Sequence, residues 1–205
     1  MKTESTNINL NFEQQAVNEG FRFIAGVDEV GRGCLAGAVV AAAVILDISK
    51  PLPAGLNDSK KISAKIRERI SEEVKQNCLA YSIGQIEAEE IDRINILRAT
   101  KKAMRLAIEN LNPRPDFLLI DAVQLKDLDL PQKAIIHGDA ISASIAAASI
   151  IAKVYRDNLM CELDKNYPAY GFAKHAGYGT KMHFEALRKF GACELHRKTF
   201  RGVVS

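Results

Sequence analysis

A chain of 205 residues, 47% hydrophobic and 26% charged, has enough apolar surface for one well-cored domain, which excludes an intrinsically disordered protein. The formal net charge of +3 is compatible with a polyanionic partner, and the longest nearly uncharged runs, residues 33–46 and 140–152, are too short to cross a membrane as helices. The four cysteines form no C-x-x-C pair and no apolar signal core opens the chain, so we expect a reduced, cytoplasmic protein without structural zinc.

Strands and helices alternate along the chain after a first pair of strands. Residues 1–20 are polar and predict a flexible arm or a short helix. We expect strands at residues 21–30, 35–46, 78–87, 117–121 and 134–137, and helices at about residues 63–76, 89–110, 141–160 and 180–190. The first two strands are joined by a tight turn at Gly31 and Gly33. This order predicts a mixed α/β sheet covered by helices.

Two adjacent acids, Asp28 and Glu29, end the first expected strand. Neighbouring strand residues face opposite sides, so both acids can enter one site only where the strand end is open or bulged. A buried carboxylate without a partner costs several kcal/mol, and we therefore expect water, a cation or a metal to meet at least one of them. An isolated pair of this kind is otherwise typical of a solvated turn.

Two further acids, Asp121 and Asp139, lie at or just beyond strand ends, where α/β sheets place their sites. Taken singly, Asp121 is typical of a strand that ends at the surface and Asp139 of a helix N-cap. With Asp28 and Glu29 they favour Mg²⁺ or Mn²⁺, because carboxylate oxygen suits hard ions and the sequence lacks the Cys and His clusters of zinc sites. Two such ions about 3.5–4 Å apart can activate a water for phosphodiester hydrolysis.

Eight segments in order resemble the signatures of the ribonuclease HII family. They are DEVGRGCLAGAVVAAAVIL, LNDSKK, EIDRINILRATKKAM, LLID, GD followed by SIAAASIIAKVYRD, YPAYGF, HAGYGT and HRKTF, and they extend over residues 23–200. Each segment is only moderately specific, but their common order leaves little room for chance. The length fits this family better than ribonuclease HIII, which carries an extra N-terminal domain.

The resemblance implies a ribonuclease H-like fold, a mixed five-stranded sheet flanked by helices with a small C-terminal helical segment. Residues 21–205 would form one catalytic domain whose C-terminal helical part binds substrate. The implied activity is endonucleolytic cleavage of RNA in RNA–DNA hybrids and on the 5′ side of single ribonucleotides in duplex DNA, leaving a 3′-hydroxyl and a 5′-phosphate. Asp28, Glu29, Asp121 and Asp139 match the metal-binding acids, with Mn²⁺ or Mg²⁺ as cofactor. We expect a monomer that takes part in ribonucleotide repair.

The resemblance also implies substrate contacts at the ribose. Gly31, Arg32 and Gly33 match the element that contacts the ribose at the RNA–DNA junction, and glycines let backbone groups approach a 2′-hydroxyl. A hairpin turn explains the two glycines equally well. Tyr178 matches the tyrosine that packs against the junction sugar, although a tyrosine in a glycine loop is more often a surface or core-edge residue.

Phosphate contacts are implied for one loop and one helix. Asn57, Ser59 and Lys60 match a phosphate-contacting loop, although such a run is most often a solvated turn. Lys153 and Arg156 lie three residues apart on one helix face and could reach phosphates, but ion-paired surface charge is an equal alternative for Arg156. We interpret the four histidines as structural or peripheral to the substrate.

Three positions depart from the family pattern. Cys34 stands where proline is common, Ala122 where glycine often follows, and Ala176 where lysine is common. The first two changes adjust packing or turn geometry. The third removes one phosphate contact and is expected to weaken binding and its salt dependence slightly.

Two other function classes remain open from the residues. A junction resolvase or DNA exonuclease shares the fold and the acids, but the GRG turn and Tyr178 are needed only by an enzyme that recognises a ribose. A non-catalytic nucleic-acid-binding module would use the basic surface alone and has no need of four converging acids.

Overall fold

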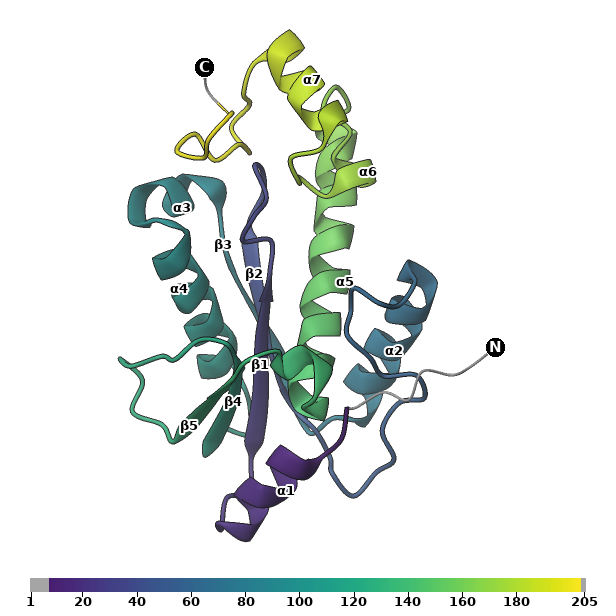
Figure 1. The fold of residues 1–205 in the computed structure, drawn as a ribbon, viewed down its shortest axis with the longest axis vertical. Coiled ribbons are helices and arrows are strands. Elements are labelled where there is room, and N and C mark those ends of the chain that lie inside the picture. Colours follow the sequence, from purple (N-terminus) through teal and green to yellow (C-terminus); the bar gives the residue numbers. More distant parts are fainter. Residues whose placement is uncertain (1–7, 204–205) are drawn as a thin grey trace.

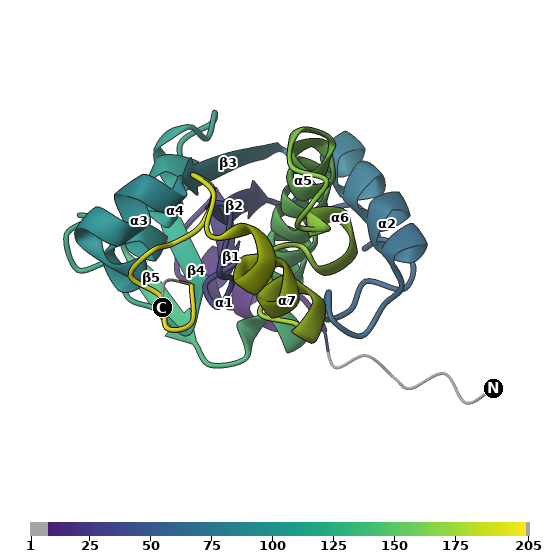
Figure 2. The ribbon, with the colours of Figure 1, turned by 90° about the horizontal axis from the view of Figure 1, so that it is seen from above.

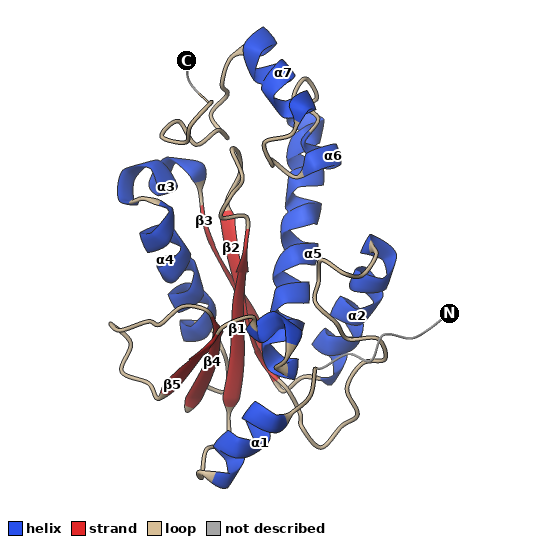
Figure 3. Cartoon of the chain, in the orientation of Figure 1, coloured by secondary structure: helices blue, strands red, loops and turns tan. Residues whose placement is uncertain are grey.

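The computed structural model describes residues 8–203, which form one sheet with helices on both faces (Figures 1 and 3). The strands are β1 (Ile24–Val30), β2 (Val39–Ile45), β3 (Ala80–Ile86), β4 (Phe117–Asp121) and β5 (Gln132–Ile135). The helices are α1 (Asn11–Asn18), α2 (Ala64–Asn77), α3 (Ala88–Ile94), α4 (Ile96–Glu109), α5 (Ala143–Asn166), α6 (Phe172–His175) and α7 (Lys181–Phe190), with a 3-10 turn, η1 (Gly138–Ala140). Within the described residues, no helix is both long and apolar enough to cross a membrane.

The five strands are arranged in the order β3-β2-β1-β4-β5. β1 pairs antiparallel with β2 and parallel with β4, and β4 pairs parallel with β5. The predicted mixed five-stranded sheet is therefore confirmed. Because β1 and β4 run in the same direction, their carboxyl ends lie at the same edge of the sheet.

The central strand β2 separates two hydrophobic cores. All seven of its residues are buried. Val39, Ala41, Ala43 and Ile45 pack with α4, whereas Val40, Ala42 and Val44 pack with α2 and α5. A strand buried on both faces has no polar positions, which is why its sequence is apolar throughout.

Helix α5 packs closely against β1 at Gly26. A Cβ atom at this position would lie 2.1 Å from the carbonyl carbon of Ser144, so any larger residue would force the helix away from the strand. The same contact brings Ser149, one and a half turns further along α5, close to Asp28, and its hydroxyl lowers the pKa of that carboxyl against the larger effect of burial. The sheet end and the helix are thus held together where the acids lie.

Several expected element boundaries differ from the structure, and three differences change the description of the fold. The second strand begins at Val39 rather than residue 35, and residues 31–38 form an irregular segment rather than a tight hairpin turn. The last strand ends at Ile135 rather than residue 137. The single helix expected at residues 89–110 is divided into α3 and α4 at Asn95, whose φ of 69° leaves the helical region and whose side chain caps α4.

The N-terminal arm contains an ordered helix, α1. Its Glu13 is buried and accepts hydrogen bonds from the hydroxyls of Ser142 and Ser144, at 2.7 and 2.6 Å. Residues 1–7 of the expected arm lie outside the described part of the chain. The described part of the arm therefore anchors the start of α5.

Helices α6 and α7 lie beyond the sheet, against the far end of α5 (Figures 1 and 2). Buried histidines connect them through a directed series of hydrogen bonds. Nδ1 of His183 donates to the carbonyl of Tyr178 (2.9 Å), so its neutral Nε2 accepts from Nε2 of His196 (3.0 Å), whose Nδ1 accepts from the amide of Cys193 (3.0 Å). Both histidines must be neutral for this series to hold.

Burial and the neighbouring histidines lower the pKa of His183 and lower that of His196 from 6.5 to about 4. Below about pH 6.5 these two histidines bind protons in the unfolded chain but stay neutral in the native chain, where their pKa values are lower. We therefore expect the contribution of these two histidines to the free energy of unfolding to be greatest above about pH 6.5 and to fall as the pH decreases toward 4.

Urea unfolding between pH 4.5 and 7.5 tests this expectation. His196→Gln, whose amide keeps one donor and one acceptor without titrating, should lose less stability over this range than the unchanged protein. An equal loss in both proteins would contradict the assignment.

Candidate active site

The four predicted acids lie at one edge of the sheet. Asp28 and Glu29 are near the carboxyl end of β1, and Asp121 ends the parallel neighbour β4. Asp139 lies on η1, and the adjacent Gly138 amide donates to Oδ1 of Asp121 at 2.7 Å. The charge of Asp121 is felt by Asp28 and Glu29, and that of Asp139 by Asp121. Residues separated by more than one hundred positions in sequence thus form one electrostatic cluster.

Burial makes these carboxylates hard to ionise. Asp28 is only 4% exposed, and its pKa is raised well above the usual range by burial first and by Glu29 second. The pKa of Glu29 is raised by burial, against the opposing effect of Arg32, whose guanidinium lies 3.1 Å from it. Burial and the charge of Asp139 raise the pKa of Asp121. A cation placed among them would remove this repulsion.

The donor set fits a hard divalent cation. Oε2 of Glu29 is buried and has no hydrogen-bond partner among the described residues, and Oδ1 of Asp28 accepts from the amide of Glu29. Lys60 places its ammonium 3.2 Å from Oδ2 of Asp139 and so supplies part of the compensating charge. Among residues 8–203, no three His, Cys, Asp or Glu side chains form a preassembled metal cage.

The glycines of the GRG segment differ in what the fold requires of them. Gly31 has a φ of +91°, and a Cβ there would lie 2.3 Å from Nε of Arg156. Gly33 is exposed, has no positive φ, and a Cβ there would have no atom within 4 Å. The fold therefore needs glycine at position 31, whereas nothing in the described chain needs it at position 33.

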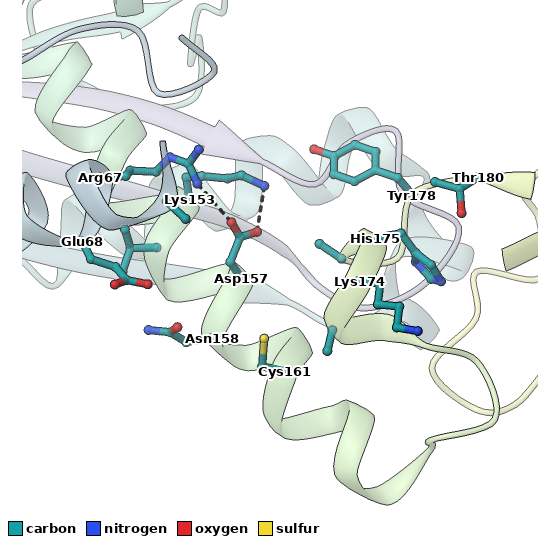
Figure 4. A pocket seen from close by; sticks show the side chains of 14 residues that line it. Arg67, Glu68, Lys153, Asp157, Asn158, Cys161, Lys174, His175, Tyr178 and Thr180 are labelled. Carbon is teal, nitrogen blue, oxygen red and sulfur yellow. Dashed lines mark hydrogen bonds and ion pairs between the residues drawn. The ribbon is translucent and has the colours of Figure 1, made fainter. Parts of the chain in front are cut away.

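Tyr178 lies close to this segment and beside a cavity of about 530 Å³ (Figure 4). It forms a backbone bridge with Cys34, and its side chain is 39% exposed. Nζ of Lys153 is 5.7 Å from the centre of the tyrosine ring. Tyrosine and lysine therefore present an aromatic face and a positive charge to the same space.

Asp157 holds two cations beside the cavity. Lys153 donates to its Oδ1 at 2.7 Å and Arg67 donates to its Oδ2 at 3.3 Å, as the dashed lines in Figure 4 indicate. Neither Arg67 nor Asp157 was expected from the sequence, because their pairing joins α2 to α5 over 90 positions.

Two of the predicted phosphate contacts, Arg156 and Ser59, have buried side chains. Arg156 is fully buried, and its guanidinium donates to the carbonyls of Ala36, Ala38 and Ala176, so it is neither a solvent-facing phosphate contact nor a surface ion pair. Ser59 is 3% exposed, and its hydroxyl shares a hydrogen bond with Ser149, which holds its loop against α5. Both side chains are occupied within the protein.

The remaining predicted contacts are accessible to different extents. The Lys60 side chain is 79% exposed, whereas Oδ1 of Asn57 accepts from the amide of Asp58 at 2.9 Å. The residue most clearly missed is Arg197, which is fully buried and donates to the carbonyls of Arg32 and Gly37. Its only sequence signal is its place in the HRKTF segment, since its acceptors lie 160 positions or more away.

Comparison with known proteins gives one family. The family model described as Ribonuclease HII matches residues 25–203. The ribonuclease HII of Desulfitobacterium hafniense (strain DSM 10664 / DCB-2) is 56% identical over 194 residues, which cover 95% of this chain and 74% of that protein.

Solved structures agree. The crystal structure of the ribonuclease H2 from Pyrococcus horikoshii OT3 has a TM-score of 0.74 at 25% identity, with 89% of this chain and 95% of that chain covered. The ribonuclease HII of Archaeoglobus fulgidus, solved as a complex with PCNA, has a TM-score of 0.76 at 26% identity, with 88% and 96% covered. This chain therefore belongs to the ribonuclease HII family and is a ribonuclease H, an endonuclease acting on the RNA of RNA–DNA hybrids.

Proposed function

We propose that this ribonuclease H also cuts duplex DNA on the 5′ side of a single embedded ribonucleotide. The observation that carries the proposal is the open space at Gly33, on a segment that starts beside the acid cluster and reaches Tyr178 through the bridge at Cys34. A ribose that enters this space meets backbone polar groups, and its 2′-hydroxyl is the group that distinguishes RNA from DNA. Tyr178 would pack against the sugar and exclude water from its other side.

The acids are the proposed metal ligands. Asp28, Glu29, Asp121 and Asp139 would hold Mg²⁺ or Mn²⁺, which when bound neutralise phosphate charge and help to activate a water. Attack by the water oxygen on phosphorus breaks the bond to the 3′-oxygen of the preceding nucleotide. The products are a 3′-hydroxyl and a 5′-phosphate on the ribonucleotide.

Cations near the acids and Tyr178 are the proposed phosphate contacts. Lys60 and Arg32 flank the cluster, and Lys153 lies next to Tyr178. Positive charges at these places orient the nucleic-acid backbone without reading its sequence. Both an RNA–DNA hybrid and a ribonucleotide-containing DNA duplex present such phosphates.

The cellular setting stays a prediction. Four free cysteines support the expected reducing, cytoplasmic location, and we retain a monomer with a single catalytic domain at residues 21–205 as the working description. Removal of ribonucleotides from DNA is the role that a cut at a single ribose would serve.

Asp121→Asn tests the acid cluster. The amide keeps the size and the acceptor for the Gly138 amide but removes one charge, so duplex binding should stay equal or become tighter. Turnover should fall by more than about a hundredfold, since even residues behind metal ligands cost 10- to 100-fold. Binding is measured without divalent ions and cleavage with Mn²⁺.

Asp116→Asn is the matched control, because within residues 8–203 the Asp116 carboxylate accepts only from the backbone amides of Arg22 and Phe23, at the opposite end of β1. Unchanged turnover in Asp121→Asn would overturn the assigned site. A well-folded unchanged protein that binds duplexes but never cuts them would favour a binding module.

Gly33→Ala tests the ribose site. The added methyl meets no protein atom, so the unfolding midpoint should stay within experimental error or rise slightly. Cleavage at a single ribonucleotide should fall by about a hundredfold, because a displacement of the order of 1 Å at a reacting group has that effect.

Gly31→Ala provides the contrast. Its positive φ and the nearby Arg156 predict a loss of stability of about 1–3 kcal/mol or more, measured by urea unfolding. Full cleavage by Gly33→Ala would show that no substrate group approaches this glycine.

A further inference from the structure

Two buried arginines hold the segment that connects β1 to β2. Arg156 and Arg197 are fully buried, and neither lies within ion-pair distance of a carboxylate among the described residues. Their guanidinium groups donate only to backbone carbonyls, all on residues 32–38 and 176. Burying an arginine without a counter-charge is unfavourable, and burial lowers the pKa of Arg197 to about 10. Five of the six hydrogen bonds go to residues 32–38, so this cost is borne chiefly where that segment is held.

Arg197 determines the direction of one peptide group in that segment. Its Nη1 donates to the carbonyl of Arg32 at 3.0 Å, while Nε and Nη2 both donate to the carbonyl of Gly37, at 3.1 and 2.8 Å. Because Arg197 is inside the protein, the Arg32 carbonyl points inward. The peptide between Arg32 and Gly33 is trans, so the amide of Gly33 points the opposite way, outward.

The outward amide of Gly33 is available to a ligand. No described residue accepts a hydrogen bond from it, and no atom surrounds the position of a Cβ. It lies four residues after Glu29 and one before Cys34, which is bridged to Tyr178. An N–H group in this place can donate to a sugar hydroxyl.

The segment that carries Arg197 is itself anchored at both sides. Its backbone pairs with residues 35–37, since Arg197 donates to the carbonyl of Leu35 and Gly37 donates to that of Leu195. Beyond it, the amides of Lys198 and Thr199 donate to the carboxylate of Asp92 on α3. Figure 2 shows this segment running from α7 toward α3.

We propose that Arg197 is a positioning residue for ribose recognition, which holds the Arg32 carbonyl inward so that the Gly33 amide donates to the 2′-hydroxyl of the substrate. This proposal rests on the proposed cleavage at single ribonucleotides. Arg197 touches no phosphate, so its effect differs from that of a surface cation. It selects the sugar and leaves the electrostatic attraction of the duplex unchanged.

Arg197→Lys is the test. Lysine keeps the charge but has no planar fork to reach both carbonyls. Binding is measured with Ca²⁺ in place of the active ion, for a DNA duplex with one ribonucleotide and for an all-DNA duplex. The ratio of the two affinities should fall about tenfold, the value of one hydrogen bond, while the salt dependence of all-DNA binding is unchanged. Ile108→Val, on the buried face of α4, is the control for lost stability and should keep the ratio.

A double-variant cycle locates the effect. With Gly33→Ala already blocking the amide, Arg197→Lys should lower the ratio no further, because both changes act on one contact. Additive effects, or an equal loss of binding to both duplexes, would overturn the proposal. If Arg197→Lys does not fold, Asp92→Ala is the second test, because it removes the carboxylate on α3 that anchors the segment carrying Arg197. A lower affinity ratio in Asp92→Ala supports the proposal, and an unchanged ratio overturns it. An unchanged protein without any preference for ribose would instead refute the proposed function itself.

Discussion

The mutual repulsion of carboxylates at the shared end of β1 and β4 is the constraint on which the site depends. Asp28 and Asp121 come from parallel neighbours, and Asp28 is almost completely buried. Burial and neighbouring negative charge both raise the pKa values of these groups, so the protein alone does not satisfy them. Hard cations and the phosphate that such cations attract are the natural complement of this arrangement. Keeping these charges together therefore lowers the stability of the fold.

Helix α5 connects the acid cluster to the segment around Tyr178. Close contact at Gly26 fixes its start against β1, and Ser149 on the same helix meets both Asp28 and Ser59. Further along, Arg156 holds the segment that contains Gly33, and Lys153 lies beside Tyr178. One rigid helix therefore sets the relative positions of the acids, the loop and the aromatic residue. Rigid support of this kind is what a precise active site requires.

Sequence reasoning identified the parts that depend on local patterns and missed those that depend on distant contacts. The apolar run of β2 and the acids at strand ends were legible, because strand burial and charge placement are local properties. The break at Asn95 was missed because helical periodicity continues through it. Arg156 and Arg197 were misread or overlooked because arginine is normally exposed, and only the folded chain shows which carbonyls surround it.

We propose that the acid cluster and the adjacent glycine segment act together to cut next to a ribose. Mapping the cleavage position on a DNA duplex with one embedded ribonucleotide, at single-nucleotide resolution and with Mn²⁺, tests this proposal most directly. The expected result is one cut, on the 5′ side of the ribonucleotide, that leaves a 3′-hydroxyl and a 5′-phosphate, and no cut in an all-DNA duplex. Equal cleavage of the all-DNA duplex, or cleavage confined to long RNA–DNA hybrids, would contradict it.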